Sequence, residues 1–215
     1  MLYPLNLSLT GKNCVIIGGG KVAERKAKTL LEADALVTVI APEVTREIES
    51  LAAKHKLKIK KTGYQCGMIK SLRPLLVFCA ASDDSVNLSA IKEAKRCGVL
   101  VNAATRPDLT DFQVPAKVIS GDLLFTVSTN GKSPAVAKLI RQQLEAEYPP
   151  AFADFLERMS RLRQEIKVKP GGSAAHQEFW RQALKPAVID LVRAGHLEQA
   201  EYEVRNGIID AGVES

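Results

Sequence analysis

A glycine-rich turn near the start of the chain is the stretch best placed to do chemistry. The apolar run Cys14-Val15-Ile16-Ile17 leads into Gly18-Gly19-Gly20-Lys21-Val22-Ala23. The pattern G-x-G-x-x-A after a strand is typical of dinucleotide binding. Gly18 permits a tight turn, Gly20 removes a side chain where a pyrophosphate would approach, and Ala23 lets the next helix pack closely. Free N–H groups at that helix start would face the anion. Similar turns also serve packing alone, so these residues by themselves leave both interpretations open.

The turn needs a sheet to hold it, and strand and helix patterns alternate for about ninety residues around it. Leu75 to Ala81 is continuously apolar, as expected of a parallel strand buried on both faces. The alternation predicts a Rossmann-type doubly wound parallel sheet with its ligand crevice at the carboxyl ends of the strands. The expected strands are 14–17, 36–41, 57–61, 75–81 and 99–102, and the expected helices are 21–33, 43–55 and 86–97.

The second strand departs from the usual dinucleotide pattern. An acidic residue commonly ends this strand and binds the ribose 2′-hydroxyl, but here the strand ends in Ala41-Pro42. Glu43 follows, and it either takes that role or is a first-turn acid favoured by the helix dipole. No arginine stands at the strand end to bind a 2′-phosphate, although Arg46 is one turn further on, so the sequence favours NAD over NADP.

The strand at 75–81 ends in Ser82-Asp83-Asp84. Small polar groups at this place either line a cofactor cleft or cap the following helix, and capping is the more conservative interpretation.

The pattern changes after Asn102. A polar loop, 103–112, precedes two apolar strands, 114–120 and 123–129, which flank a Gly121-Asp122 hairpin turn. Ser133 and Pro134 are a helix cap and a first helical residue. We therefore predict a dinucleotide-binding domain (1–113), a hairpin-plus-helix segment (114–147) and a helical C-terminal domain (148–215). Lys169 to Ser173 would separate two helical stretches of that domain, and Pro186 would restart the second.

The net charge and the aromatic content of the chain limit the kinds of ligand that it can bind. The 215 residues carry a net charge of +6, and residues 1–113 hold all of the excess, with 17 Lys and Arg against 11 Asp and Glu. Such a region attracts a polyanion or is simply a solvated surface. The lysines of 54–61 alternate with Leu57 and Ile59, which favours an edge strand over a binding site. Aromatic residues are only 5% of the chain, which argues against nucleic-acid binding.

The sequence predicts a cytoplasmic protein without a membrane span, because no apolar run approaches the roughly 18 residues that a span needs. The four cysteines show no metal-like or redox spacing and are expected to be structural. The three histidines, His55, His176 and His196, are expected to be surface groups, and no metal ligands are predicted.

Several motifs together resemble precorrin-2 dehydrogenase, the oxidising and sometimes metal-inserting part of siroheme synthase. The resemblance covers nearly all of 1–147, with the helical tail also expected. It rests on Val-Ile-Ile-Gly-Gly-Gly-Lys-Val-Ala-Glu-Arg-Lys at 15–26, Ala-Ala-Ser-Asp-Asp at 80–84, Val-Asn at 101–102, Asp-Phe-Gln-Val-Pro-Ala at 111–116 and Ser-Thr-Asn-Gly-Lys-Ser-Pro-Ala at 128–135.

The resemblance implies NAD-dependent oxidation of precorrin-2, a tetrapyrrole with eight carboxylates, to sirohydrochlorin. It also implies a homodimer in which the 114–147 segment is the dimerisation segment and its hairpin strands pair across the interface. The cofactor-binding residues would be Gly18, Gly20, Lys21, Val22, Ala23, Pro42, Glu43, Ser82 and Asn102. The polycarboxylate substrate would meet Ser128, Thr129, Lys132 and Ser133.

One departure concerns proton transfer. The family usually reads Asn-Val-Val-Asp after the fifth strand, and its aspartate is taken to serve proton transfer and chelation; here the run ends in Thr105. A hydroxyl is a poor base and a poor iron ligand. Asp111 is the candidate substitute, Asp108 is expected to be a turn former, and ferrochelatase activity is doubtful. The alternative is a catalytically impaired dinucleotide-binding sensor or tetrapyrrole carrier, and the intact glycine turn speaks against a chelatase-only enzyme.

Overall fold

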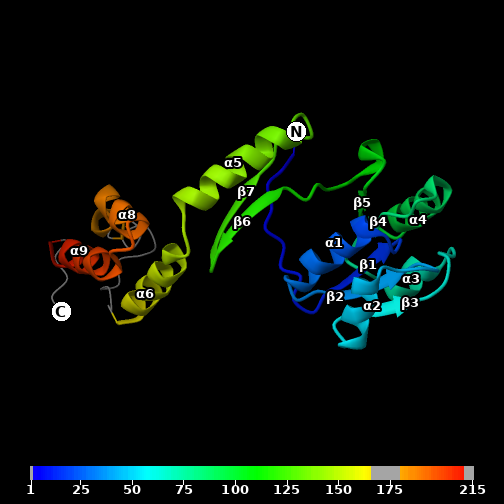
Figure 1. The fold of residues 1–215 in the computed structure, drawn as a ribbon, viewed down its shortest axis with the longest axis horizontal. Helices are drawn as coiled ribbons and strands as arrows, with labels where there is room; N and C mark the ends of the chain where they lie inside the picture. The colour runs from blue at the N-terminus through cyan, green and yellow to red at the C-terminus, as the bar shows by residue number, and fades with distance from the viewer. Residues whose placement is uncertain (1, 166–179, 211–215) are drawn as a thin grey trace. The chain divides into compact units, whose positions relative to one another are not determined.

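The computed structural model describes residues 2–165 and 180–210. The chain divides into two compact units, Met1–Val114 and Pro115–Ser215. The first unit is a layered α/β structure, and the second combines a β-hairpin with helices (Figure 1).

The first unit is built on a five-stranded sheet in the order β3-β2-β1-β4-β5. All neighbouring strands are parallel. The strand order reverses beside β1, which is the switch point where open α/β sheets bind ligands. The predicted Rossmann-type sheet is therefore confirmed. The strands are β1 (Asn13–Ile17), β2 (Leu36–Ile40), β3 (Lys58–Lys60), β4 (Leu76–Cys79) and β5 (Leu100–Ala103).

Helices cover both faces of the sheet because successive strand residues point to opposite sides. Cys14 and Ile16 pack under α1 (Lys21–Leu31) and α2 (Arg46–Ala53). Val15 and Ile17 pack under α3 (Met68–Leu72) and α4 (Asp84–Arg96) on the other face.

Three expectations in this unit need correction. The second helix begins at Arg46, because the Thr45 hydroxyl accepts a hydrogen bond from Ile48 N (3.3 Å) and caps it there. Glu43 precedes that cap, so its interpretation as a first-turn acid is wrong. The apolar spacing within residues 21–33 predicts that Val22 faces the sheet, but Val22 is 39% exposed and Ala23 is buried instead.

The third correction is α3, which the sequence did not predict. This helix has five residues, too few to show a helical period. By contrast, β3 is an edge strand with Lys58 and Lys60 exposed and Ile59 half-buried, as the lysine pattern indicated.

The second unit begins with the antiparallel strands β6 (Ala116–Ser120) and β7 (Leu123–Val127), joined at Gly121-Asp122 as predicted. The helices that follow are α5 (Pro134–Glu147), α6 (Ala151–Glu165), α8 (Pro186–Arg193) and α9 (Leu197–Asp210). The predicted cap is confirmed, because the Ser133 side chain accepts from Val136 N and Pro134 is the first helical residue. Lys169 to Ser173 lie outside the described residues.

The hairpin turn packs within this unit against the helix that follows α5. A Cβ on Gly121 would lie 2.6 Å from Ala153 Cβ, and Ser120 Oγ donates to Pro149 O at 3.2 Å. The separation of a dimerisation segment from the tail at residue 147 stays a prediction.

Two cysteines are core residues. Cys14 and Cys79 are buried, and burial raises the pKa of the Cys14 thiol to about 11. They act as small apolar groups, as the sequence indicated. In residues 2–165 and 180–210, no helix is long and apolar enough to cross a membrane.

Candidate functional site

Gly18 brings the end of β1 into close contact with the end of β4. Its φ is +113°, in the region that favours glycine. A Cβ at this position would lie 2.4 Å from Ala80 O and 2.7 Å from Ala81 N. Because these are backbone atoms, a side chain would force the two strand ends apart. The tight turn assigned to Gly18 from the sequence is therefore present.

Gly19, to which the sequence analysis gave no role, holds the loop after β2 against the glycine turn. A Cβ here would lie 2.0 Å from Glu43 O, and Thr45 N donates to Gly19 O at 3.0 Å. Pro42 and Glu43, both exposed, thus lie beside the glycine turn. The signal in the sequence was the third consecutive glycine, which the G-x-G-x-x-A pattern does not require.

Gly20 differs from the other two glycines because the space where its Cβ would lie is empty to 4 Å. It is the N-cap residue of α1, and no side chain caps that helix start in the described structure. An uncapped helix N-terminus carries N–H groups and a partial positive charge directed at any bound anion. An open approach and available donors fit a dinucleotide pyrophosphate.

Lys21 and Glu24 flank this helix start. The Lys21 ammonium lies 3.0 Å from the Glu24 carboxylate, and this hydrogen bond lowers the pKa of Glu24. The Lys21 side chain remains 84% exposed.

The turn after β4 is fixed by hydrogen bonds. Asp83 caps α4 by accepting from Ser85 N at 2.8 Å, and its contacts with Ser85 lower the pKa of Asp83. The capping interpretation is thus confirmed for Asp83, and Ser82 is exposed beside it. Asn87, which the sequence analysis missed, is 1% exposed and bonds both Ala81 N (3.0 Å) and Ala81 O (2.9 Å). The sequence did offer one sign of Asn87, because it is a polar residue at an apolar position of the helix.

The chain after β5 turns back along that strand. The Asp111 carboxylate accepts from Val101 N at 3.0 Å, and Asp111 N donates to Val101 O at 2.8 Å. Lys95 lies 3.5 Å from the same carboxylate. Asn102 Nδ2 donates to Phe112 O at 2.9 Å. These contacts give Asp111 a structural function beside the second residue of β5, and they hold the returning chain in place.

A group of polar residues remains where β4 and β5 end. Thr105 Oγ1 donates to Asp84 Oδ1 at 3.4 Å, and Arg106 lies 3.6 Å from Asp84 Oδ2. Arg106 also forms two bonds to Asp108, at 3.1 and 2.8 Å, and its guanidinium lowers the pKa of Asp108. Thr105 therefore has a carboxylate neighbour that the sequence pattern did not reveal.

The candidate substrate residues Ser128, Thr129 and Ser133 shape the turn before α5. Thr129 Oγ1 donates to Ser133 O and accepts from Ser133 N, each at 3.1 Å. Ser128 Oγ accepts from Asn130 N at 3.3 Å. The Lys132 side chain is exposed.

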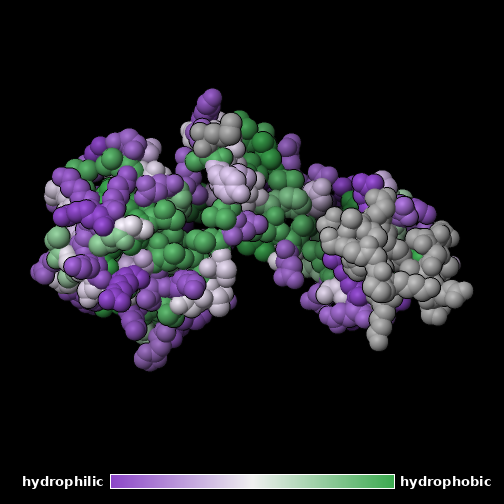
Figure 2. All heavy atoms as spheres, turned by 180° about the vertical axis from the view of Figure 1, so that it is seen from behind, coloured by the Kyte–Doolittle hydropathy of each residue, from purple (hydrophilic) through white to green (hydrophobic). Residues whose placement is uncertain are grey.

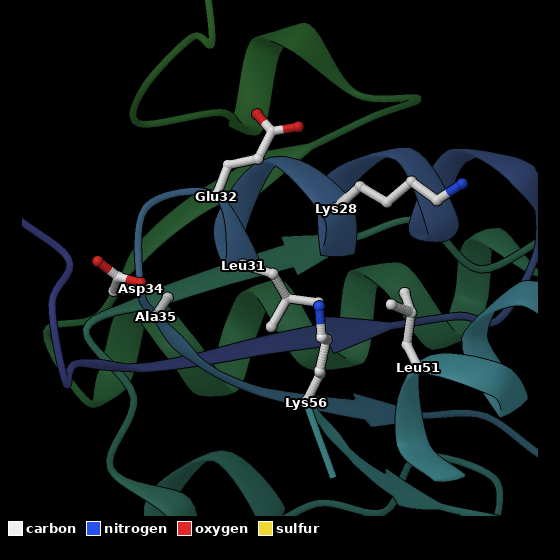
Figure 3. A pocket seen from close by; sticks show the side chains of 7 residues that line it. All are labelled: Lys28, Leu31, Glu32, Asp34, Ala35, Leu51 and Lys56. Carbon is white, nitrogen blue, oxygen red and sulfur yellow. The ribbon is translucent and has the colours of Figure 1, made fainter. Parts of the chain in front are cut away.

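A hollow of about 580 Å³ lies at the amino ends of the strands, opposite the end of the sheet that carries the glycine turn (Figure 3). It adjoins residues that precede β2 and β3, so it is at the amino ends of these strands and away from the glycine turn. Its lining residues are Lys28, Leu31, Glu32, Asp34, Ala35, Leu51 and Lys56. Strand ends of this polarity are not where open α/β sheets bind dinucleotides.

Among the residues that the structure describes, no group of three or more His, Cys, Asp and Glu side chains is arranged to hold a metal ion. His176 lies outside the described ranges.

Comparisons with known proteins agree with the observed architecture. A family model described as "Putative NAD(P)-binding" matches residues 5–116. A second, described as "Sirohaem biosynthesis protein central", matches residues 126–147. The solved structure of "SirC, precorrin-2 dehydrogenase" is 25% identical and covers 95% of this chain and 100% of its own, with a TM-score of 0.71.

Longer relatives match as well. A siroheme synthase of Nitrosococcus oceani is 34% identical over 98% of this chain and 44% of its own length. A siroheme synthase of Methylococcus capsulatus is 33% identical over 92% of this chain and 41% of its own. The chain thus spans less than half the length of these relatives. The chain belongs to the putative NAD(P)-binding family, and its resemblance to the precorrin-2 dehydrogenase and siroheme synthase family is confirmed.

Proposed function

We propose that this chain catalyses the NAD-dependent oxidation of precorrin-2 to sirohydrochlorin, a step of siroheme biosynthesis. The observation that carries the proposal is the likeness to a solved precorrin-2 dehydrogenase along 95% of the chain. The siroheme synthase relatives and the open, uncapped glycine turn support it.

The glycine turn is the part that holds the dinucleotide in this proposal. Gly18 and Gly19 bring the strand ends and the β2 loop together, and Gly20 leaves room for the pyrophosphate. Glu43 is our candidate for the ribose hydroxyls because its backbone lies against Gly19. The bound dinucleotide supplies a hydride acceptor. The remaining proposed contacts are Lys21, Val22, Ala23, Pro42, Ser82 and Asn102.

The substrate is a polycarboxylate, and charge supports this choice. All of the net positive charge of the chain falls in residues 1–113, and a basic surface raises the local concentration of a polyanion. In the second unit, Lys132 and the Ser133-Pro134 helix start are candidates to bind an acid arm of the substrate.

We also propose a homodimer formed through the hairpin and α5. Apolar side chains gather over these elements (Figure 2), and unpartnered apolar surface of this kind marks interfaces. The exposed large apolar residues there are Ile119, Leu124, Val136, Leu139 and Ile140. We also propose that the protein is cytoplasmic.

The direct test is anaerobic incubation of the protein with precorrin-2 and NAD⁺, followed by absorption spectroscopy. The proposal expects sirohydrochlorin and NADH to appear in equal amounts. Dinucleotide binding without any oxidation of precorrin-2 would instead favour the sensor or carrier function. Thr105 is the reason for keeping that alternative, and activity gained only in a Thr105→Asp variant would support it. Ferrochelatase activity is not part of the proposal.

A further inference from the structure

The proposed oxidation removes two hydrogens from the substrate, and only one of them leaves as hydride. A bound dinucleotide would accept the hydride with its electron pair, and the other hydrogen leaves the substrate as a proton while the new double bond forms. A positioned carboxylate near the reacting atoms accelerates such a proton transfer by about 10²- to 10⁴-fold. The following inference rests on the proposed function and concerns the group that takes this proton.

Five carboxylates come after strands that end at the carboxyl edge of the sheet, and most of them already have a structural or binding function. Asp83 caps α4 through Ser85 N. Asp108 forms two bonds with Arg106 at 3.1 and 2.8 Å. Glu43 stands after β2, on the side of the glycine turn where we place the ribose. Asp111 accepts from Val101 N at 3.0 Å and lies 3.5 Å from Lys95. Asp84 is the fifth.

Asp84 is the first residue of α4, and its contacts leave it able to accept a proton. Its Oδ1 meets Thr105 Oγ1 at 3.4 Å, its Oδ2 meets Arg106 at 3.6 Å, and its side chain is 55% exposed. Both contacts are long. They orient the carboxylate but leave the lone pairs of its oxygens available to accept a proton, which short hydrogen bonds would not. The stronger bonds of Arg106 go to Asp108.

We propose that Asp84 accepts the proton in this oxidation and that Thr105 and Arg106 are the residues that position its carboxylate. A substrate C–H or N–H bond breaks, its hydrogen becomes bonded to a carboxylate oxygen of Asp84, and the bonding pair stays on the substrate. Thr105 thus need not be a base. Its hydroxyl orients the carboxylate of Asp84, the base that follows β4.

The test compares Asp84→Asn with the native full-length chain in the precorrin-2 assay. We expect kcat to fall about 100-fold or more. The KM for precorrin-2 and the NAD⁺ affinity, measured by calorimetry without substrate, should stay within about twofold. Glu47→Gln is the matched control, because it makes the same acid-to-amide change in the first turn of α2. It should leave kcat unchanged.

Thr105 is tested as a positioning residue. Thr105→Val should lower kcat without changing KM, and Thr105→Ser should restore it because the hydroxyl returns. A native-like kcat in Asp84→Asn overturns the inference. So does an equal loss of kcat in Glu47→Gln, or a failure of Thr105→Ser to restore the Thr105→Val loss. A native protein that binds NAD⁺ but never oxidises precorrin-2 instead refutes the proposed function, and the inference falls with it.

Discussion

Substitution of Gly20 by alanine separates dinucleotide binding from folding. A Cβ at Gly20 meets no atom within 4 Å, and the φ of −81° suits any residue. Alanine is about 0.5 to 1 kcal/mol less favourable than glycine as an N-cap. The gain from a less flexible unfolded chain is about 0.4 to 1 kcal/mol. The two effects nearly cancel, so the stability of Gly20→Ala should stay within about 0.5 kcal/mol of the native value.

Binding should respond differently. The added methyl group occupies the space through which a pyrophosphate reaches the N–H groups of α1. The loss of one hydrogen bond to a charged group costs about 1.5 to 3 kcal/mol, which weakens NAD⁺ binding about 10- to 100-fold. Calorimetric titration with NAD⁺ and urea unfolding measure the two quantities on the same samples.

Two other glycine-to-alanine variants serve as controls for Gly20→Ala. Gly63→Ala adds the same methyl group at another open position and should change neither quantity. Gly18→Ala should unfold more easily, because its Cβ meets Ala80 O at 2.4 Å. If Gly20→Ala binds NAD⁺ as tightly as the native chain, the pyrophosphate does not approach the backbone at this residue, and the reasoning is refuted.

Three further substitutions test a buried carboxylate, a carboxylate bonded to β5 and the exposed apolar face of α5. Glu93 is 4% exposed and accepts from Tyr64 and from Gly67 N and Lys70 N (2.8 Å each); burial raises its pKa, but these bonds outweigh burial and leave the pKa lowered. Glu93→Gln should therefore lower the free energy of unfolding by about 1.5 to 3 kcal/mol in urea at pH 7. This loss should shrink as the pH falls through the native pKa of Glu93, because the native carboxylate is then protonated and its charged form no longer stabilises the fold. An equal loss at all pH values would contradict this. Asp111→Asn should lower unfolding stability by about 1 kcal/mol, and an unchanged midpoint would show that its bond to the β5 backbone is unimportant. Leu139→Glu should convert a dimer to a monomer in analytical ultracentrifugation, because it places a charge on the exposed apolar face of α5; a monomeric native chain would contradict the proposed dimer.

The sheet of the first unit was predictable because its signals are local. Continuous apolar runs such as Leu76–Cys79 have no stable place except between two layers of helices. The hairpin turn at Gly121-Asp122 and the cap at Ser133 were predictable for a similar reason, since each depends on two or three neighbouring residues.

The parts that the sequence could not reveal depend on contacts between distant residues. Glu93 holds the start of α3 from 23 to 29 positions away, and a five-residue helix has too few turns to be recognised. Thr105 and Asp84 are 21 positions apart, so the carboxylate beside Thr105 became visible only when the ends of β4 and β5 were placed together. Asp111 offered a carboxylate in the expected loop, but backbone pairing with Val101 engages it.

The proposed function depends on binding of a dinucleotide at the glycine turn. Calorimetric titration of the native full-length chain with NAD⁺ and with NADP⁺ tests it most directly. We expect saturable one-site binding of NAD⁺ and weaker binding of NADP⁺, because no arginine stands at the end of β2 to bind a 2′-phosphate. The absence of binding heat with NAD⁺ and NADH at both low and physiological salt would contradict it.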